Sequence, residues 1–175
     1  MQEIYSENLK KILQNKKKLE KELSIKIKNK GKFFFIEGEP ENEYLALKVF
    51  QAINLGFPIG VALELKNEET NLNIINIRNL TKRKNLKEIK ARIIGTYGKT
   101  ISNIENLSEC AISLHDNQVG IIGDYEKIND AIIAIESLIK GAKQGNVYAR
   151  LEKERKKRRL KPPEKIINEL KNEKN

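Results

Sequence analysis

Apolar positions along this chain of 175 residues repeat with an offset of 85 positions. One helical stretch lies between Gly38 and Gly56, and a second lies between Gly123 and Gly141. Both stretches place apolar residues every three to four positions, which is the spacing of a helix with one buried face. Because such self-similarity indicates a duplicated structural unit, the pattern predicts two copies of one fold.

A pair of short strand-like runs precedes each of these helices. The first pair covers residues 24–28 and 33–36, and the second covers residues 110–114 and 119–122. Turn-forming residues separate the members of each pair, and the offset carries Ile25 onto Cys110. Each unit is therefore predicted to contain a β-hairpin followed by its long helix.

Further helices and one more strand precede each hairpin. The helical stretches are 8–23 in the first unit and 83–94 and 99–108 in the second. A strand is expected over 72–77 in the second unit, and a weaker counterpart is expected over 2–5 in the first. The predicted fold class is α+β, with the order β-α-α-β-β-α present twice in two units packed together. The predicted boundaries are a first unit over 1–57, a connecting helix and loop over 58–71, a second unit over 72–142 and a basic helical tail over 143–175.

Positive charge is concentrated in three segments of the chain. The whole sequence carries 34 Lys and Arg against 24 Asp and Glu, a net charge of +10, and segments 1–30, 82–99 and 150–175 carry +5, +6 and +6. Such clusters on an otherwise acidic body are typical of a surface that neutralises phosphates. The alternative is a solvated helix face, which stays open for 1–30 because Lys and Glu alternate there. In segment 82–99, seven bases face a single acid, which favours a phosphate-binding surface.

The motif Gly95-Thr96-Tyr97-Gly98 joins the two helices expected in the second unit. Gly-x-x-Gly is common by chance, but this copy follows a basic stretch and precedes two strands and a long helix. Without Cβ atoms, the two glycines let the backbone turn sharply and approach a sugar-phosphate chain. The free amides at the start of the next helix then point toward phosphate oxygens. The alternative is a plain helix–turn–helix corner.

We expect the RNA-contacting residues to be the loop, its basic and aliphatic flanks and the five consecutive bases of the tail. They are Lys82, Arg83, Lys84, Lys90, Arg92, Ile93, Ile94, Gly95, Thr96, Tyr97, Gly98, Lys99, Arg155, Lys156, Lys157, Arg158 and Arg159. Ile101 and Ile104 are further candidates for the groove floor, although some of these isoleucines must face the core. Residues 16–18, three lysines in the first unit, are expected to add at most diffuse attraction.

Other chemistry-bearing residues favour structural explanations. His115 falls in a predicted turn. Cys110 aligns with Ile25 in the repeat, which predicts a small core residue. The run Phe33–Phe35 lies in a strand, where core packing is the more direct explanation and base stacking the alternative. One His and one Cys build no metal site, and no apolar run is long enough for a membrane span or a secretory signal. We therefore expect no catalysis, cofactor, metal or membrane, and a cytoplasmic protein.

The element order around the glycine loop resembles a type I KH domain, whose loop clamps about four nucleotides of single-stranded RNA. The first unit has no glycine before Gly31, so it resembles a degenerate KH unit without the loop. Residues 90–95, 98–100, 121–123 and above all 141–152 resemble the archaeal two-KH-domain small-subunit ribosome assembly factors of the partner-of-Nob, Dim and Krr type. In that family Thr96 stands where a basic residue is common.

The resemblance implies a non-enzymatic role in ribosome biogenesis. It implies binding of single-stranded RNA near the 3′ end of small-subunit (16S) rRNA, and help to the endonuclease that matures that end. The alternative is a KH-based scaffold for a nuclease or a translation initiation factor, with incidental RNA contact. A metal-dependent nuclease is a further alternative, but the sequence offers no carboxylate cluster beside the basic loop.

Overall fold

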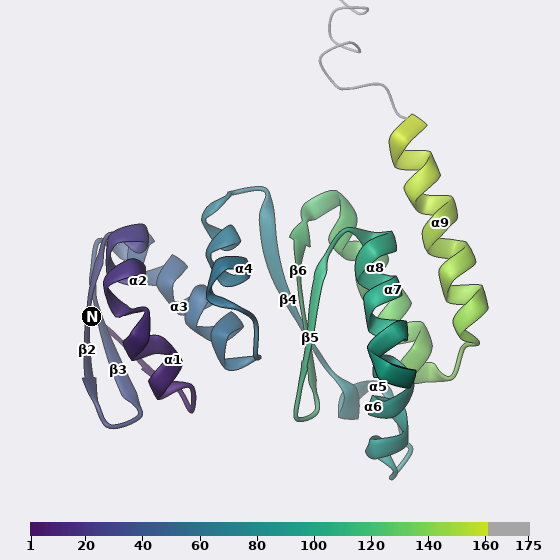
Figure 1. Ribbon diagram of the computed structural model, residues 1–175, viewed down its shortest axis with the longest axis horizontal. Coiled ribbons are helices and arrows are strands. Elements are labelled where there is room, and N and C mark those ends of the chain that lie inside the picture. Colours follow the sequence, from purple (N-terminus) through teal and green to yellow (C-terminus); the bar gives the residue numbers. More distant parts are fainter. Residues whose placement is uncertain (161–175) are drawn as a thin grey trace, which may run out of the picture.

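Two three-stranded antiparallel sheets organise the protein, and a computed structural model describes residues 1–160 (Figure 1). The first sheet has the strand order β1-β3-β2, and the second has the order β4-β6-β5. The elements of the first unit are β1 (Gln2–Tyr5), α1 (Leu9–Gln14), α2 (Lys16–Leu23), β2 (Ile25–Lys30), β3 (Phe33–Gly38) and α3 (Pro40–Asn54). The strands and helices predicted for this unit are confirmed, including the weak first strand.

A short linker leads to the second sheet and its helices. The linker holds α4 (Ile59–Leu63) and a 3-10 turn, η1 (Glu64–Lys66). The elements that follow are β4 (Thr70–Asn76), α5 (Ile77–Leu80), α6 (Leu86–Ile94), η2 (Thr96–Gly98), α7 (Lys99–Ser108), β5 (Ala111–His115), β6 (Gln118–Asp124), α8 (Tyr125–Lys140) and α9 (Gln144–Leu160). The connecting helix and the helix after Gly141 are confirmed as elements. The predicted tail residues 161–175 lie outside the described part of the chain.

The repeat seen in the sequence extends to individual hydrogen bonds. Glu20 accepts a hydrogen bond from the backbone amide of Ile27 at 2.8 Å, and Glu105 accepts one from Ile112 at 2.8 Å. These two pairs are related by the same offset of 85 residues. In each unit, a carboxylate on the second helix therefore fixes the first strand of the hairpin.

The two units differ in the segment between the first strand and the hairpin. The chain between Tyr5 and Ile25 is 14 residues shorter than the chain between Asn76 and Cys110, although the flanking strands keep equivalent pairing. In the first unit a single residue, Asn15, separates α1 from α2. In the second unit four residues separate α6 from α7. The glycine loop is therefore present in the second unit and missing from the first, as the sequence indicated.

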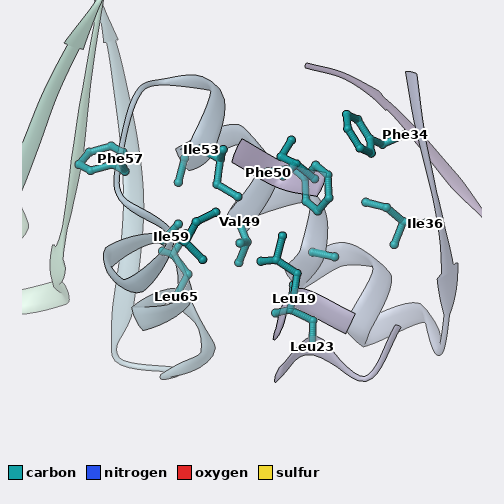
Figure 2. Close-up of a cluster of buried hydrophobic side chains, with 14 of the residues drawn as sticks. Leu19, Leu23, Phe34, Ile36, Val49, Phe50, Ile53, Phe57, Ile59 and Leu65 are labelled. Atoms are coloured by element: carbon teal, nitrogen blue, oxygen red, sulfur yellow. The ribbon is translucent and has the colours of Figure 1, made fainter. Parts of the chain in front are cut away.

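Helices α1 to α3 cover one face of the first sheet, and their apolar side chains form its core. Figure 2 shows Phe34 and Ile36 of β3 facing Val49 and Phe50 of α3, with Leu19 of α2 beside them. Each of these side chains is fully buried. At about 1.5–3 kcal/mol for each buried side chain of this size, the cluster is the main source of stability in the first unit.

The second sheet lies between the first unit and the helices of the second unit (Figure 1). Leu55 and Phe57 of the first unit pack so closely on Gly120 of β6 that a Cβ atom there would lie 2.7 Å from the Phe57 ring. Ser113 of β5 also donates a hydrogen bond to the Leu55 carbonyl at 2.6 Å. On its other face the sheet packs against α8. The chain thus forms successive layers, with the first sheet at one end and α9 at the other.

Two boundaries around β4 differ from the prediction. The strand was expected over 72–77 after a loop over 66–71, but it begins at Thr70 and ends at Asn76. The Asn76 side chain accepts a hydrogen bond from the Arg78 amide and opens α5, a helix that was not predicted. This local cap ends the strand even though Ile77, the next residue, is apolar and fully buried.

Candidate nucleic-acid interface

The glycine loop forms an exposed corner between α6 and α7. Helix α6 ends at Ile94 and is followed by Gly95, whose φ of 74° is left-handed, and α7 begins after Gly98, whose φ is 75°. Between them Tyr97 also has a left-handed backbone, with a φ of 53°, and its side chain is 97% exposed. The corner therefore holds a large aromatic ring in solvent.

The two glycines serve different purposes. A Cβ atom on Gly95 would lie 2.1 Å from the Thr100 hydroxyl oxygen and 2.8 Å from the Thr100 backbone nitrogen, so no other residue fits there. Among residues 1–160, a Cβ atom on Gly98 would meet nothing within 4 Å. Gly95 therefore allows the loop to close on α7, while Gly98 leaves an open surface beside the first turn of α7. A phosphate group can approach the backbone amides there.

Helix α9 supports the loop from one side. The Gln144 side-chain amide donates to the Thr100 hydroxyl at 2.9 Å, and Thr100 is itself buried. Arg92 donates to the Ala142 carbonyl at 2.6 Å, at the junction between α8 and α9. These contacts tie the end of α6, the start of α7 and the start of α9 together. The loop is thus presented on a packed three-helix corner.

The basic side chains expected around the loop lie mostly in solvent. Lys99 is exposed at the start of α7, and Lys90 and Arg92 are partly exposed on α6. The exposed residues Lys82, Arg83 and Lys84 lie in the segment before α6. Within residues 1–160, none of these six forms a salt bridge with a carboxylate. Their charge is therefore available to an anionic ligand.

The aliphatic residues beside the loop divide between core and surface. Ile94 is 40% exposed and Ile101 is partly exposed, whereas Ile93 and Ile104 are fully buried. The side chain of Ile93 belongs to the core, so the expectation that it contacts RNA is corrected at this position. The reason is helical geometry, because adjacent residues on α6 differ in direction by about 100°. Ile94 and Ile101 remain as the apolar surface next to the glycine loop.

An open groove of about 540 Å³ lies on the α9 side of the loop. Its walls combine Gly95, Thr96 and Lys99 of the loop region with Gln144 and Tyr148 of α9. Neither Gln144 nor Tyr148 was predicted to belong to the site. Both lie in the segment 141–152 that carried the family resemblance, but nothing in their spacing showed that α9 folds back onto the loop.

The five consecutive bases near the end of α9 divide into two groups. Arg155 pairs with Glu109 at 3.4 Å, and Arg158 pairs with Asp130 of α8. Lys156, Lys157 and Arg159 remain exposed, although Lys157 also pairs with Glu154 of the same helix at 2.8 Å. Arg155 and Arg158 therefore hold α9 against the body of the protein, and the three exposed bases remain candidates for RNA contact.

Glu109 is the centre of the ion pairs that hold α9. Lys127 of α8 lies 2.9 Å from its carboxylate and also 3.0 Å from Asp124. The hydrogen bond from Lys127, with Arg155 nearby, lowers the pKa of Glu109 from its ordinary value of 4.5. The same hydrogen bonds raise the pKa of Lys127. Glu109 thus fixes the position of the basic helix.

The remaining candidate residues have structural positions. Cys110 is 5% exposed, and its burial raises the pKa of the thiol to about 11, which makes it a poor nucleophile. His115 is about half exposed at the end of β5, 3.7 Å from Asp116. Across residues 1–160, His, Cys, Asp and Glu form no group of three that could hold a metal ion. No helix in that range is long and apolar enough to cross a membrane.

Comparison with known proteins bears on this site. A family model described as the eukaryotic type KH domain, KH-domain type I, matches residues 71–156. The KH domain-containing protein MJ0443 of Methanocaldococcus jannaschii is 33% identical over 149 residues, which is 81% of this chain and 66% of that protein. The crystal structure of Dim2p from Pyrococcus horikoshii is 31% identical, covers 87% of this chain and 99% of its own, and has a TM-score of 0.78. This chain belongs to the PNO1/Dim2 family of KH-domain proteins.

Other family members carry functional names. The pre-rRNA-processing protein pno1 of Schizosaccharomyces pombe is 36% identical over 104 residues, which is 58% of this chain. A crystal structure of an a/eIF2alpha–aDim2p–rRNA complex from Pyrococcus horikoshii matches with a TM-score of 0.80 and 30% identity, covering 89% of this chain and 94% of the other. The chain spans 66% of MJ0443 and 43% of the S. pombe protein.

Proposed function

We propose that this protein binds single-stranded RNA at the glycine loop of its second unit, and that this RNA is the 3′-end region of small-subunit rRNA during ribosome biogenesis. The observation that carries the proposal is the open surface at Gly98, between the exposed ring of Tyr97 and the free charge of Lys99. Backbone amides and lysine bind phosphate there, and the aromatic ring is positioned to stack on a base. Family members named for pre-rRNA processing and for a complex with rRNA support the choice of RNA.

The proposed contact surface extends from the loop to the exposed bases on either side. It consists of Lys82, Arg83, Lys84, Lys90, Arg92, Ile94, Gly95, Thr96, Tyr97, Gly98, Lys99, Lys156, Lys157 and Arg159. In this proposal the first unit is a KH-like unit that lost its loop and supports the second from behind its sheet. The equivalent hydrogen bonds of Glu20 and Glu105 favour a common origin for the two units.

We also propose protein partners for the same role, in the cytoplasm and without catalysis by this chain. The related complex of a/eIF2alpha, aDim2p and rRNA from Pyrococcus horikoshii supports an initiation-factor subunit as one partner. The endonuclease that matures the 3′ end of the rRNA is the second. The scaffold alternative retains the protein contacts but predicts no dependence of function on the glycine loop.

Substitution at Gly98 tests the proposal. Gly98→Asp places a carboxylate in the open space where the phosphate is proposed to lie. We expect the affinity for a single-stranded oligonucleotide of the rRNA 3′ end to fall about tenfold or more, because one charge-assisted contact is lost and such a contact is worth about 1.5–3 kcal/mol. The left-handed backbone costs about 1 kcal/mol, so the melting temperature should fall by only about 2–4 °C. Fluorescence anisotropy and thermal denaturation give the two values.

Gly98→Asn is the matched control. Its side chain has the same shape and tolerates the same backbone conformation, but it has no charge. We expect it to bind RNA more tightly than the aspartate variant. Wild-type affinity in Gly98→Asp would contradict the proposed function and favour the scaffold alternative.

A further inference from the structure

The outer face of the first sheet has no covering layer within residues 1–160. Helices α1 to α3 lie on the opposite face, and β1, β3 and β2 form the end of the molecule in Figure 1. Residues along β3 alternate, so that Phe34 and Ile36 enter the core while Phe33 and Phe35 point outward. The run Phe33–Phe35 was predicted to lie in a strand, with core packing as the more direct explanation. Only the middle residue is fully buried.

Aromatic side chains occupy the uncovered face. Phe33 of β3 pairs with Tyr5 of β1, and their rings lie edge to face with centroids 5.5 Å apart. Both side chains are 46% exposed. The second sheet offers a contrast, because Leu55 and Phe57 of the first unit cover the centre of its outer face. The exposed rings of the first sheet therefore remain free for an external partner.

Lysines surround these rings. Strand β2 places Lys30 directly beside Phe33 and Lys28 directly beside Phe35. Lys32, in the turn, lies over the Tyr5 ring with its Nζ atom 5.9 Å from the ring centroid. The two glutamates of this face, Glu3 and Glu37, are outnumbered by four lysines, Lys26, Lys28, Lys30 and Lys32. Among the described residues only Lys28 of these four forms a salt bridge, with Glu37 at 2.9 Å. The face is therefore both aromatic and positively charged.

We propose that this sheet face is a second contact surface for single-stranded RNA, with bases stacking on Phe33 and Tyr5 and phosphates held by Lys26, Lys30 and Lys32. This inference rests on the proposed function and gives the first unit a direct part in it. Flat rings flanked by cations suit a polynucleotide, because each base has a face to stack and each linkage carries a negative charge. Loss of the glycine loop then removes one RNA contact from this unit and leaves another.

Substitution of Phe33 tests the inference in the full chain. Phe33→Leu keeps an apolar strand residue but removes the stacking ring, and Phe33→Tyr keeps the ring. With a single-stranded RNA of about 20 nucleotides, we expect Phe33→Leu to weaken binding about 5- to 20-fold and Phe33→Tyr to retain wild-type affinity, as the loss of one stacked base predicts. The melting temperatures of both variants should stay close to that of the wild type.

A matched control comes from helix α3. Tyr44 is 62% exposed, and Lys48 lies over its ring at 4.6 Å, so it repeats the pairing of ring and lysine away from the sheet face. We expect Tyr44→Leu to leave RNA affinity unchanged. An equal loss in Tyr44→Leu would show that any exposed aromatic ring contributes, and would overturn the assignment to the sheet.

Photo-crosslinking gives a second measurement that needs no variant. RNA carrying 5-bromouridine should form adducts at Phe33 or Tyr5 as well as near the glycine loop. Adducts at the loop alone, with wild-type affinity in Phe33→Leu, would overturn the sheet proposal and leave the proposed function intact. They would assign the face to a protein partner instead. Failure of the wild-type chain to bind any single-stranded RNA would overturn the proposed function itself.

Discussion

At the scale of single residues, a few side chains decide how the site is built, and only some could be predicted. The sequence placed the glycine motif correctly between two helices, because glycine spacing and aliphatic flanks are local signals. It could not separate Ile93 from Ile94, since either could face the core until the packing of α6 is known. The different roles of Gly95 and Gly98 likewise depend on the position of Thr100, which only the fold fixes.

Glu109 gives rise to a prediction about acid stability. Lys127 lowers the pKa of Glu109 in the folded protein. The stabilising effect of the ionised carboxylate is therefore complete above pH 4.5, and it is lost as the pH falls through the lowered pKa. We expect Glu109→Gln to lose less thermal stability than the wild type when the pH is lowered from about 6 to about 3. Thermal denaturation at several pH values measures this difference.

Glu152→Gln is the control for this measurement. Glu152 is an exposed carboxylate on α9 that takes no part in the described ion pairs around Glu109. It should keep the acid dependence of the wild type. Identical acid dependence in all three proteins would show that Glu109 contributes nothing to the docking of α9.

At the scale of elements, α9 is the feature that sequence patterns predicted least well. Its helical character and its basic end were predicted, but not its contacts. Helix α9 runs beside α7. Gln144 at the start of α9 contacts Thr100, and Arg155 further along α9 contacts Glu109. Removing the helix would also remove Leu151, which is 2% exposed and part of the second core. Charge substitutions are therefore the cleaner test of its role.

Alanine substitution of Lys156, Lys157 and Arg159 tests the contribution of α9 to binding. These three exposed bases lie about 18–23 Å along α9 from Gln144 beside the glycine loop, a distance that a few nucleotides of RNA span. We expect affinity to fall for all single-stranded sequences alike. The slope of log affinity against log salt should decrease by about 0.7 for each phosphate contact that is lost. Binding titrations at several salt concentrations give this slope.

The lysines at positions 16–18 form the comparison set on the first unit. Alanine substitution of these three lysines removes the same charge from α2, which contains no residue of the proposed contact surfaces and lies on the opposite face of the first sheet. The slope should then stay close to the wild-type value. Equal slopes for both triple variants and the wild type would show that α9 makes no contact with RNA.

At the scale of the whole molecule, the duplicated pattern was predicted with its register over the hairpin and the long helix of each unit, because an offset of 85 residues holds through these elements. The contact between the two units was not predicted, because no pattern in the sequence indicates that Leu55 and Phe57 cover the second sheet. That contact covers the centre of the outer face of the second sheet, whereas no element within residues 1–160 covers the outer face of the first sheet.

The central claim is that RNA lies across the open side of the glycine loop, and backbone amide resonances report on it directly. Titration of the isotope-labelled full chain with a single-stranded rRNA 3′-end oligonucleotide, followed by nuclear magnetic resonance, should shift the amides of residues 95–101 first and most. The amides of residues 9–23, the loopless equivalent in the first unit, should move little. Large shifts in residues 9–23 with unchanged resonances at 95–101 would contradict the account.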